Sequence, residues 1–278
     1  MQGKICVVTG TNSGIGKATA LGLAKLGATV VMVCRDRAKG EAAAKEMIGE
    51  SGNKSVDLLV ADLSSQQAIR QLAAEFKSKY TRLDVLINNA GLYLSNRTLT
   101  VDGLETTFAV NHLAYFLLTN LLLDVIKASA PSRIVNVASS AHADSLDFAN
   151  LQSEKGYDGM QAYSRSKLAN ILFTYELARR LAGSHVTVNC LHPGVIRSGL
   201  QRDMGLQFQI IARSFASPER GAETSIYLAS SPDVAGITGK YFSDKRETRS
   251  SAISYDEGVA RKLWQVSAEL TGLDAMPA

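Results

Sequence analysis

Short apolar runs alternate with longer segments of helical periodicity along most of this chain. The apolar runs fit buried strands at Ile5–Val8, Thr29–Cys34, Val56–Val60, Leu83–Ile87, Arg133–Ala138, Val186–Leu191 and Gly239–Phe242. Helical patterns lie between or after them, at Lys17–Leu26, Ala38–Ile48, Ser65–Lys79, Leu104–Lys127, Ala162–Leu181 and Pro218–Ala229. Strands that alternate with helices favour a parallel sheet covered on both faces. We therefore predict an α/β fold, with a doubly wound, mostly parallel seven-stranded sheet.

Several helix ends carry their own signals. Ser64-Ser65-Gln66-Gln67 is typical of a capping box, and Ser217-Pro218-Glu219 supplies an N-cap, a first-turn proline and an acid at the positive helix pole. The tail from Asp256 to Leu270 predicts a further helix, with Trp264 packed on the body. Beyond Thr271 we expect fraying.

The chain shows no repeat, low-complexity tract or linker, so we predict one domain over residues 1–278. Two regions look irregular, Ala141–Met160 and Gly199–Ala216. Long loops beside such a sheet are often functional lids.

A glycine-rich turn follows the first predicted strand, in Thr9-Gly10-Thr11-Asn12-Ser13-Gly14-Ile15-Gly16. A helix that begins directly after such a turn directs free backbone N–H groups and its positive pole at an anion. Gly10 permits the tight turn, Gly14 close approach of a pyrophosphate, and Gly16 packing of helix on strand. The turn therefore favours a dinucleotide site over an ordinary strand–helix connection.

Tyr163 and Lys167 lie one helical turn apart in the predicted helix Ala162–Leu181. An ammonium beside a phenol stabilises the phenolate, so we expect the pKa of Tyr163 to be lowered. Tyr163 is then a candidate proton donor to a carbonyl oxygen. The spacing alone carries little weight in a chain with 9 tyrosines, and its weight comes from the glycine-rich turn upstream.

Together with Asn88-Asn89-Ala90-Gly91 and a serine after the fifth strand, these motifs resemble the short-chain dehydrogenase/reductase family from about Gly3 to Tyr241. Other stretches resemble its retinol dehydrogenase-like branch: Cys34-Arg35-Asp36, Asn111-His112-Leu113, Asp147 to Lys155, Ser166 to Asn170 and His192 to Val195. The resemblance implies a single Rossmann-type domain, with a cofactor half at about 1–130 and a catalytic and substrate half at about 131–278. It also implies an NADP(H) cofactor.

Arg35 ends the second predicted strand, where an NAD-specific site usually has an acid that binds the ribose hydroxyls. A guanidinium can bind a 2′-phosphate bidentately, so Arg35 favours NADP(H), with Lys17 or Arg37 as helpers. Asp36 would serve the ribose if the strand ended one residue later. Two solvent-exposed residues at a strand end are the other interpretation.

The resemblance assigns further residues to the dinucleotide. Asp62 would bind the adenine amino group unless it caps a helix, Leu63 would line the ring, and the backbone of Ile196 would contact the carboxamide. Ser198 stands where the family usually has threonine. The full implied set is Gly10, Asn12, Ser13, Gly14, Ile15, Gly16, Arg35, Asp62, Leu63, Asn89, Ala90, Gly91, Tyr163, Lys167, Pro193, Gly194, Ile196 and Ser198.

The catalytic set implied by the resemblance is Asn111, Ser139, Tyr163 and Lys167. Strand spacing places the serine at Ser139, with Ser140 as the alternative after a one-residue shift. Ser139 would hold the substrate carbonyl, and Asn111 would hold a water for Lys167 unless it is only a core hydrogen-bonder. Lys167 would also bind the nicotinamide ribose.

The implied activity is reduction of a lipophilic aldehyde or ketone, with retinal-like compounds as the first expectation. The pocket is predicted from Leu92 to Leu94, Ala141 to Met160 and the apolar segment Gly199–Phe215, although the last also fits core packing. Two other hypotheses are a protochlorophyllide reductase-like enzyme and a non-catalytic NADP(H)-binding sensor or interaction protein. The long insertion before the last strands that the former carries is not evident here, and the intact catalytic set argues against the latter.

Composition limits the possible partners and the cellular compartment of the protein. A net charge of +4 spread along the chain and the lack of a nucleic-acid motif predict no nucleic-acid partner. No metal is expected, because the four histidines show no ligand spacing. Unpaired, strand-embedded Cys6, Cys34 and Cys190 favour reduced thiols in the cytoplasm.

The opening Met1–Lys4 runs directly into the first strand, and the apolar stretch Leu113–Ile126 is short for a bilayer. We therefore expect a soluble protein without an integral membrane segment, with peripheral membrane association left open. The resemblance implies a homodimer or homotetramer, although the long helices fit burial within one subunit equally well.

Overall fold

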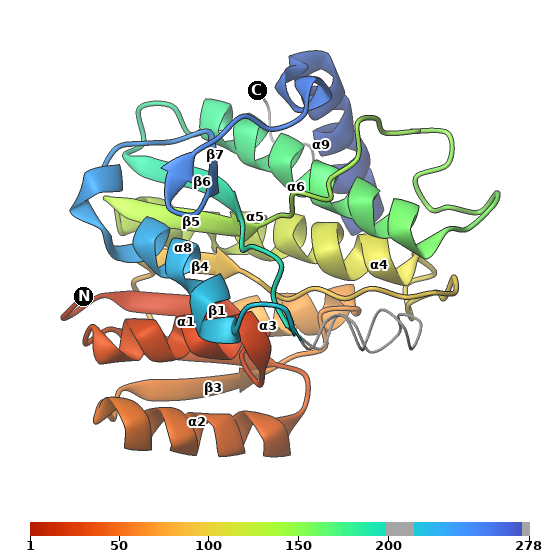
Figure 1. Ribbon diagram of the computed structural model, residues 1–278. Helices are drawn as coiled ribbons and strands as arrows, with labels where there is room; N and C mark the ends of the chain where they lie inside the picture. The colour runs from red at the N-terminus through yellow and green to blue at the C-terminus, as the bar shows by residue number, and fades with distance from the viewer. Residues whose placement is uncertain (198–213, 274–278) are drawn as a thin grey trace.

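A central sheet organises the structure, a computed structural model that describes residues 1–197 and 214–273 (Figure 1). Its strands are β1 (Ile5–Thr9), β2 (Thr29–Cys34), β3 (Val56–Val60), β4 (Val85–Asn88), β5 (Ser132–Val137), β6 (Val186–His192), β7 (Lys240–Ser243) and β8 (Arg246–Glu247). The helices are α1 (Gly14–Lys25), α2 (Arg37–Ser51), α3 (Gln66–Lys79), α4 (Thr106–Phe108), α5 (Ala114–Ala128), α6 (Gly159–Arg180), α8 (Pro218–Ser230) and α9 (Glu257–Thr271). Short 3-10 turns lie at Pro232–Val234 and Ala252–Tyr255.

The strand order is β3-β2-β1-β4-β5-β6-β7-β8, and every pair is parallel except β7 with β8. The predicted doubly wound parallel sheet is therefore confirmed, with one strand more than expected. β8 has two residues, Arg246 and Glu247, and both are exposed. Because no buried face shapes its sequence, no apolar run marks it.

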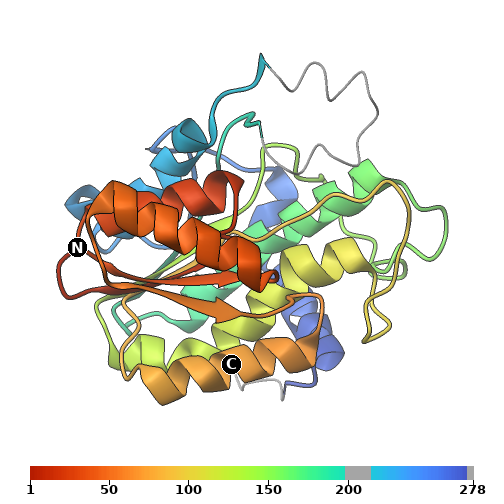
Figure 2. The same cartoon turned by 90° about the horizontal axis from the view of Figure 1, so that it is seen from below.

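Alternate residues of the inner strands face opposite helix layers. In β1, Val7 joins the core beneath α3, α5 and α6, whereas Cys6 and Val8 join the core beneath α1, α2 and α8. Figures 1 and 2 show these helix layers on the two sides of the sheet. Burial on both faces explains why the inner strands are continuous apolar runs.

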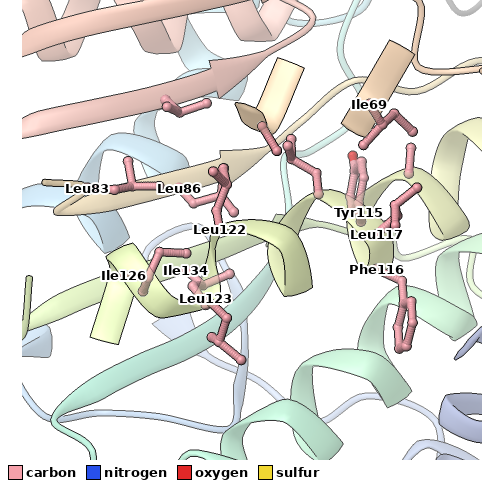
Figure 3. Close-up of a cluster of buried hydrophobic side chains, with 14 of the residues drawn as sticks. Ile69, Leu83, Leu86, Tyr115, Phe116, Leu117, Leu122, Leu123, Ile126 and Ile134 are labelled. Carbon is pink, nitrogen blue, oxygen red and sulfur yellow. The ribbon is translucent and has the colours of Figure 1, made fainter. Parts of the chain in front are cut away.

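The larger core cluster lies between α3, α5 and the sheet. Figure 3 shows Leu122 of α5 near Leu86 and Ile134, which come from neighbouring strands β4 and β5, and Ile69 of α3 towards Tyr115 and Leu117 of α5. This packing fixes α5 against the sheet. The residues before α5 consequently have a defined position near the carboxyl ends of the strands.

The winding of the chain reverses between β1 and β4, which are neighbours in the sheet but not in the sequence. In open α/β sheets, the loops that leave such a point diverge to opposite faces and open a crevice at the carboxyl ends of the strands. The glycine-rich turn after β1 and the Asn-Asn-Ala-Gly segment after β4 both lie there.

The helix predicted over Leu104–Lys127 is divided. It begins at Thr106, where the Glu105 carboxylate accepts hydrogen bonds of 2.7 Å from the backbone N–H groups of Thr107 and Phe108. A π-helical turn at Ala109–Leu113 then separates α4 from α5. Such single-turn bulges occur often at functional sites. Apolar periodicity does not reveal one extra residue in a turn, so the sequence predicted a single helix.

Two caps can be compared with the predictions. Ser217 caps α8 and accepts from the N–H of Arg220, as expected. The capping box at Ser64 is wrong by one position, because Ser65 is the N-cap of α3 and accepts from Ala68 N. Adjacent serines make this register ambiguous in the sequence.

The predicted C-terminal helix is present as α9, and Trp264 packs on the body as expected. Its ring lies 4.9 Å from that of Phe116 on α5 and 5.8 Å from that of Phe173 on α6, and the Arg180 guanidinium stacks on it at 4.2 Å. Helix α9 thus buries apolar side chains of α5 and α6 within one chain.

Within the described residues, one helix, Thr106–Ala128, is long and apolar enough to cross a bilayer, and 78% of its apolar window is buried inside the protein. Its composition is accounted for by its place in the core. All three cysteines are buried and unpaired, as the sequence predicted.

We predict that Trp264→Ala lowers the free energy of unfolding by about 3–5 kcal/mol, because it leaves a cavity between α5, α6 and α9. Chemical denaturation followed by circular dichroism measures the change. Trp264→Phe, which retains an aromatic ring, should cost much less. Equal losses would contradict the packing role given to the indole.

Candidate functional site

A cavity of about 770 Å³ opens at the carboxyl ends of β1, β2, β4, β5 and β6. Nearly every residue that the sequence analysis assigned to a site lines it: Gly10, Asn12, Ser13, Gly14, Ile15, Gly16, Arg35, Asp62, Leu63, Asn89, Ala90, Gly91, Ser139, Tyr163, Lys167, Pro193, Gly194 and Ile196. The two exceptions are Asn111, which lies behind the wall, and Ser198, which is outside the described residues.

The glycine-rich turn forms one end of this cavity. Gly10 and Gly14 have left-handed φ angles of 74° and 58°, which glycine adopts without strain. A Cβ atom on Gly10 would lie 2.9 Å from the Ala90 Cα, and one on Gly16 would meet the Gly10 carbonyl oxygen. Both positions therefore require glycine.

Helix α1 begins inside the turn at Gly14, and its N-cap Ser13 makes no side-chain capping hydrogen bond. The first turn of α1 also contains no acidic residue. The turn thus leaves backbone N–H groups and the positive helix pole directed at the cavity, which is the donor set for a phosphate. These features fit the pyrophosphate of a dinucleotide.

Thr9 connects the turn to the segment after β4, a role that the sequence analysis missed. Its buried hydroxyl accepts from the backbone N–H groups of Asn89 at 2.9 Å and Ala90 at 3.0 Å. The Asn89 amide donates to the Thr9 carbonyl oxygen at 2.8 Å. A threonine at the end of a strand gives no sign of these contacts, because its partners lie 80 residues away.

Arg35 and Asp36, the two alternatives at the end of β2, have different environments. Asp36 caps α2, accepting from Lys39 N at 3.0 Å and pairing with the Lys39 ammonium at 3.3 Å. These bonds to Lys39 lower the pKa of its carboxyl. Arg35 is exposed, lines the cavity and has no ion pair with any described residue.

The proposed helpers of Arg35 lie elsewhere. Lys17 pairs with Glu46 at 2.6 Å, Arg37 pairs with Glu41 at 3.7 Å, and neither lines the cavity. Lys39, which the sequence analysis did not consider, lines the cavity beside Arg35. This end of the cavity therefore carries a cationic rim.

Asp62 closes the turn after β3. Its Oδ1 accepts from the backbone N–H of Ser64 at 3.0 Å and from the Ser64 hydroxyl at 2.8 Å, while Ser65 caps α3. Asp62 therefore does not cap the helix, which was the rival interpretation. Asp62 and Leu63 both line the cavity, as the predicted adenine contacts require.

Tyr163 lies at the other end, in the second turn of α6, which begins at Gly159 behind the cap Asp158. Burial raises the pKa of Tyr163 to about 12, and a hydrogen bond with Ser139 opposes the rise. The expected lowering of this pKa by Lys167 is therefore not met. The phenol stays protonated at neutral pH, which suits a proton donor.

Lys167 is fully enclosed one turn further along α6. Its Nζ donates to the Val137 carbonyl oxygen at 3.0 Å and lies 5.5 Å from the centroid of the Tyr163 ring. Burial lowers the pKa of this amine to about 8. An ammonium has three N–H groups, so hydrogens beyond the one given to Val137 remain for a ligand in the cavity.

The two candidate serines after β5 are separated by their surroundings. Ser139 is buried, and its Oγ accepts from Ala141 N at 3.1 Å, which leaves its hydroxyl hydrogen to donate. Ser140 is exposed, and its Oγ lies 3.2 Å from His192 Nε2. The geometry therefore brings Ser139, and not Ser140, to Tyr163.

Asn111 lies in the π-helical turn, and protein groups accept both amide hydrogens of its side chain. The side chain exchanges two hydrogen bonds with the backbone of Leu92, at 2.8 and 2.9 Å, and donates to the Ser166 hydroxyl at 3.0 Å. Asn111 thus fixes the loop after β4 against α6, close to Lys167. The implied water-holding role stays a prediction.

His142 positions the turn that carries Ser139, which the sequence analysis did not foresee. Its Nε2 accepts from Ser251 N at 3.0 Å, so the hydrogen is on Nδ1, which donates to the Ser139 carbonyl oxygen at 2.7 Å.

The described residues hold no cluster of three or more His, Cys, Asp or Glu that could bind a metal.

Apolar side chains form much of the cavity wall, among them Leu92, Leu94, Met160 and Phe215 from the predicted pocket segments, and also Val110. The predicted pocket residues Leu200, Met204, Leu206, Phe208, Ile210 and Ile211 fall outside the described residues.

Residues 4–207 match the family model described as short chain dehydrogenase. Mouse retinol dehydrogenase 14 is 48% identical over 291 residues, which cover 98% of this chain and 87% of the mouse protein. The structure of an uncharacterised Mycobacterium paratuberculosis protein aligns with a TM-score of 0.81 and 34% identity over 99% of this chain and 96% of its own. The complex of Pseudomonas aeruginosa RhlG with NADP aligns with a TM-score of 0.71 and 30% identity, over 87% and 94% of the two chains.

We predict a pH-dependent effect of Lys167→Met on the free energy of unfolding. Because burial lowers the pKa of Lys167 from 10.5 to about 8, the cost of burying its charge is full below pH 8 and vanishes above 10.5. The stability of the variant relative to the parent should therefore fall by about 3 kcal/mol between pH 7 and pH 10.5. Denaturant titrations at several pH values measure it, with exposed Lys54→Met as the control. A difference that does not vary with pH would rule out a depressed pKa.

Proposed function

The chain belongs to the short-chain dehydrogenase family, and we propose that it reduces a lipophilic aldehyde or ketone, retinal-like in type, to the alcohol with NADP(H). The observation that carries this proposal is the convergence of Ser139, Tyr163 and Lys167 on one end of a single cavity, with Arg35 at the other. The glycine turn and α1, which lie between these two ends, fit a nicotinamide dinucleotide, NAD(P)(H). Similar proteins whose structures were solved with NADP support the same cofactor class.

The preference for NADP(H) rests on the end of β2. A guanidinium without a carboxylate partner binds a phosphate well, while the Asp36 carboxylate is held by the N-terminus of α2. Lys39 adds a second cation at the same rim, although its ion pair with Asp36 weakens its attraction for a phosphate. An NAD-specific site would place a free acid there.

The bound dinucleotide would supply the hydride. Ser139 donates its hydroxyl hydrogen to the substrate carbonyl oxygen and holds the carbon in place. Tyr163 gives its proton to the same oxygen, and its raised pKa keeps that proton available at neutral pH. Lys167 would hydrogen-bond the nicotinamide ribose, and it stabilises the tyrosinate that proton transfer leaves behind.

The substrate class is supported by the apolar side chains in the cavity wall and by the retinol dehydrogenase relatives. A soluble cytoplasmic protein and a homodimer or homotetramer remain predictions, as do the cofactor half at about 1–130 and the catalytic half at about 131–278. Because Trp264 of α9 packs on Phe116 of α5 and Phe173 of α6, the parts of these helices that it covers are not open to a partner subunit.

Tyr163→Phe tests the proton donor. We predict that it lowers turnover by at least about 10²-fold, because only the hydroxyl is removed, while NADPH binding stays nearly unchanged. Steady-state kinetics and fluorescence titration with NADPH measure the two properties. Tyr227→Phe, which makes the same change on α8 outside the cavity lining, is the matched control and should retain turnover. Retained turnover in Tyr163→Phe would show that the proton comes from elsewhere.

Arg35→Ala tests the cofactor preference. It should raise KM for NADPH roughly 10- to 100-fold, and that for NADH far less, because a charge-assisted contact with the 2′-phosphate is lost. Arg37→Ala removes a nearby cation that is paired with Glu41 and should leave both values unchanged. If Arg35→Ala changed KM equally for the two cofactors, Arg35 would not be the residue that binds the 2′-phosphate.

A further inference from the structure

Two histidines from different elements bind the peptide group that joins Ser139 to Ser140. Its carbonyl oxygen, which belongs to Ser139, accepts from His142 Nδ1 at 2.7 Å. Its N–H group, which belongs to Ser140, donates to His192 Nδ1 at 3.1 Å. Within the described part of the chain, this peptide group has no other hydrogen-bond partner. The two imidazoles therefore hold one peptide group at both of its polar ends.

The two rings carry their hydrogens on different nitrogens. His142 Nε2 accepts from Ser251 N at 3.0 Å, so its hydrogen is on Nδ1 and is donated to the Ser139 carbonyl oxygen. His192 Nδ1 accepts from Ser140 N, so its hydrogen is on Nε2, which lies 3.2 Å from the Ser140 hydroxyl oxygen. A protonated His192 would have a hydrogen on both nitrogens and could not accept from Ser140 N. The contact that His192 makes therefore requires a neutral ring.

The same peptide group determines how the chain continues past Ser139. The backbone is fixed on β6 as far as Ala138, whose N–H donates to the Leu191 carbonyl oxygen at 2.8 Å. Beyond the peptide group, Ala141 N donates to Ser139 Oγ at 3.1 Å. Rotation of the peptide changes ψ of Ser139 and φ of Ser140, which are two of the angles that place Ala141 N against this oxygen. Because that bond occupies Oγ as an acceptor, it leaves the hydroxyl hydrogen for donation, and its loss would free the hydroxyl to turn.

The surroundings of His192 keep its ring neutral at neutral pH. Burial lowers its pKa below the ordinary 6.5, and the neighbouring His142 acts in the same direction, whereas Asp244 opposes the shift. Asp244 lies between β7 and β8 and pairs with Arg220 of α8 at 3.3 Å. His142 and Asp244 are the titratable groups that act on this ring among the described residues. His192 is therefore an acceptor for Ser140 N at neutral pH and loses this role only in acid.

We propose that His142 and His192 are positioning residues that keep Ser139 directed at Tyr163 by fixing the peptide group behind it. We call these two histidines and the peptide group between Ser139 and Ser140 the peptide clamp. His192 supplies its pH-sensitive contact, because it accepts a hydrogen bond, whereas His142 donates one. The consequence for turnover rests on the proposed function, whereas the existence of the clamp does not.

NMR of the full chain labelled with ¹⁵N tests the clamp without reference to catalysis. At neutral pH we expect opposite tautomers, with the hydrogen on Nδ1 in His142 and on Nε2 in His192. As the pH falls below 6.5, the Ser140 amide resonance should move together with the protonation of His192, because its acceptor is lost. The proposal is overturned if either ring has the other tautomer, or if the Ser140 amide does not follow His192.

Two variants separate the acceptor from the ring. In His192→Asn the side-chain oxygen can occupy the position of Nδ1 and does not titrate, so the Ser140 amide should stay constant where the parent amide moves. In His192→Leu no acceptor remains, and this amide should exchange with solvent roughly tenfold faster than in the parent. If His192→Leu does not fold, the Asn variant still decides, because an amide that titrates there as in the parent would exclude His192 as its partner.

Turnover is measured separately with NADPH and a lipophilic aldehyde. In an active parent we expect His192→Leu to lower kcat roughly tenfold with little change in KM for NADPH, because the carbonyl is held less accurately, and His192→Asn to recover most of the loss. At acid pH, kcat of the parent should fall more steeply than that of His192→Asn. Equal kcat values in His192→Leu and the parent would overturn the positioning role.

His185→Asn is the matched control. This histidine is exposed directly before β6, and its left-handed φ of 59° is one that asparagine also adopts. The variant should behave like the parent in both assays, and a change equal to that of His192→Leu would show an effect on β6 as a whole instead. The expected tautomers and amide titration in a chain that reduces no carbonyl would overturn the proposed function and leave the clamp standing.

Discussion

The site depends on an amine that is held inside the protein. Lys167 reaches the cavity only because α6 packs across the sheet and the Val137 carbonyl oxygen, at the end of β5, accepts its hydrogen bond. The cost of burying this amine appears as a pKa lowered to about 8. In the proposed reaction, a group that titrates so close to neutrality can adjust its charge to the proton that Tyr163 gives or takes.

The parallel sheet brings distant parts of the chain to this amine. The serine after β5, the π-helical turn before α5 and the tyrosine of α6 meet because each lies near the carboxyl end of a strand. Asn111 and His142 then fix the two loops around them through backbone groups of Leu92 and Ser139. The proposed catalytic groups are therefore supported by hydrogen bonds from several elements, as a preorganised site requires.

The sequence predicted those features that depend on local pattern. Apolar runs made seven strands visible, and glycine chemistry made the dinucleotide turn visible, whereas the exposed strand β8 left no apolar signal. Long-range contacts were not predictable, and the bond between His112 and Ser267 joins residues 155 positions apart. The direction of the Tyr163 pKa shift was also wrong, because the Tyr-Lys spacing reveals the neighbouring cation but not the degree of burial.

The most direct test of the account is the oxidation of NADPH and NADH by the purified full chain across a panel of aldehydes and ketones, followed by loss of nicotinamide absorbance. The account predicts carbonyl-dependent oxidation that is faster with NADPH and greatest for lipophilic compounds. NADPH binding without oxidation by any member of the panel would contradict it, and would favour a cofactor-binding sensor instead.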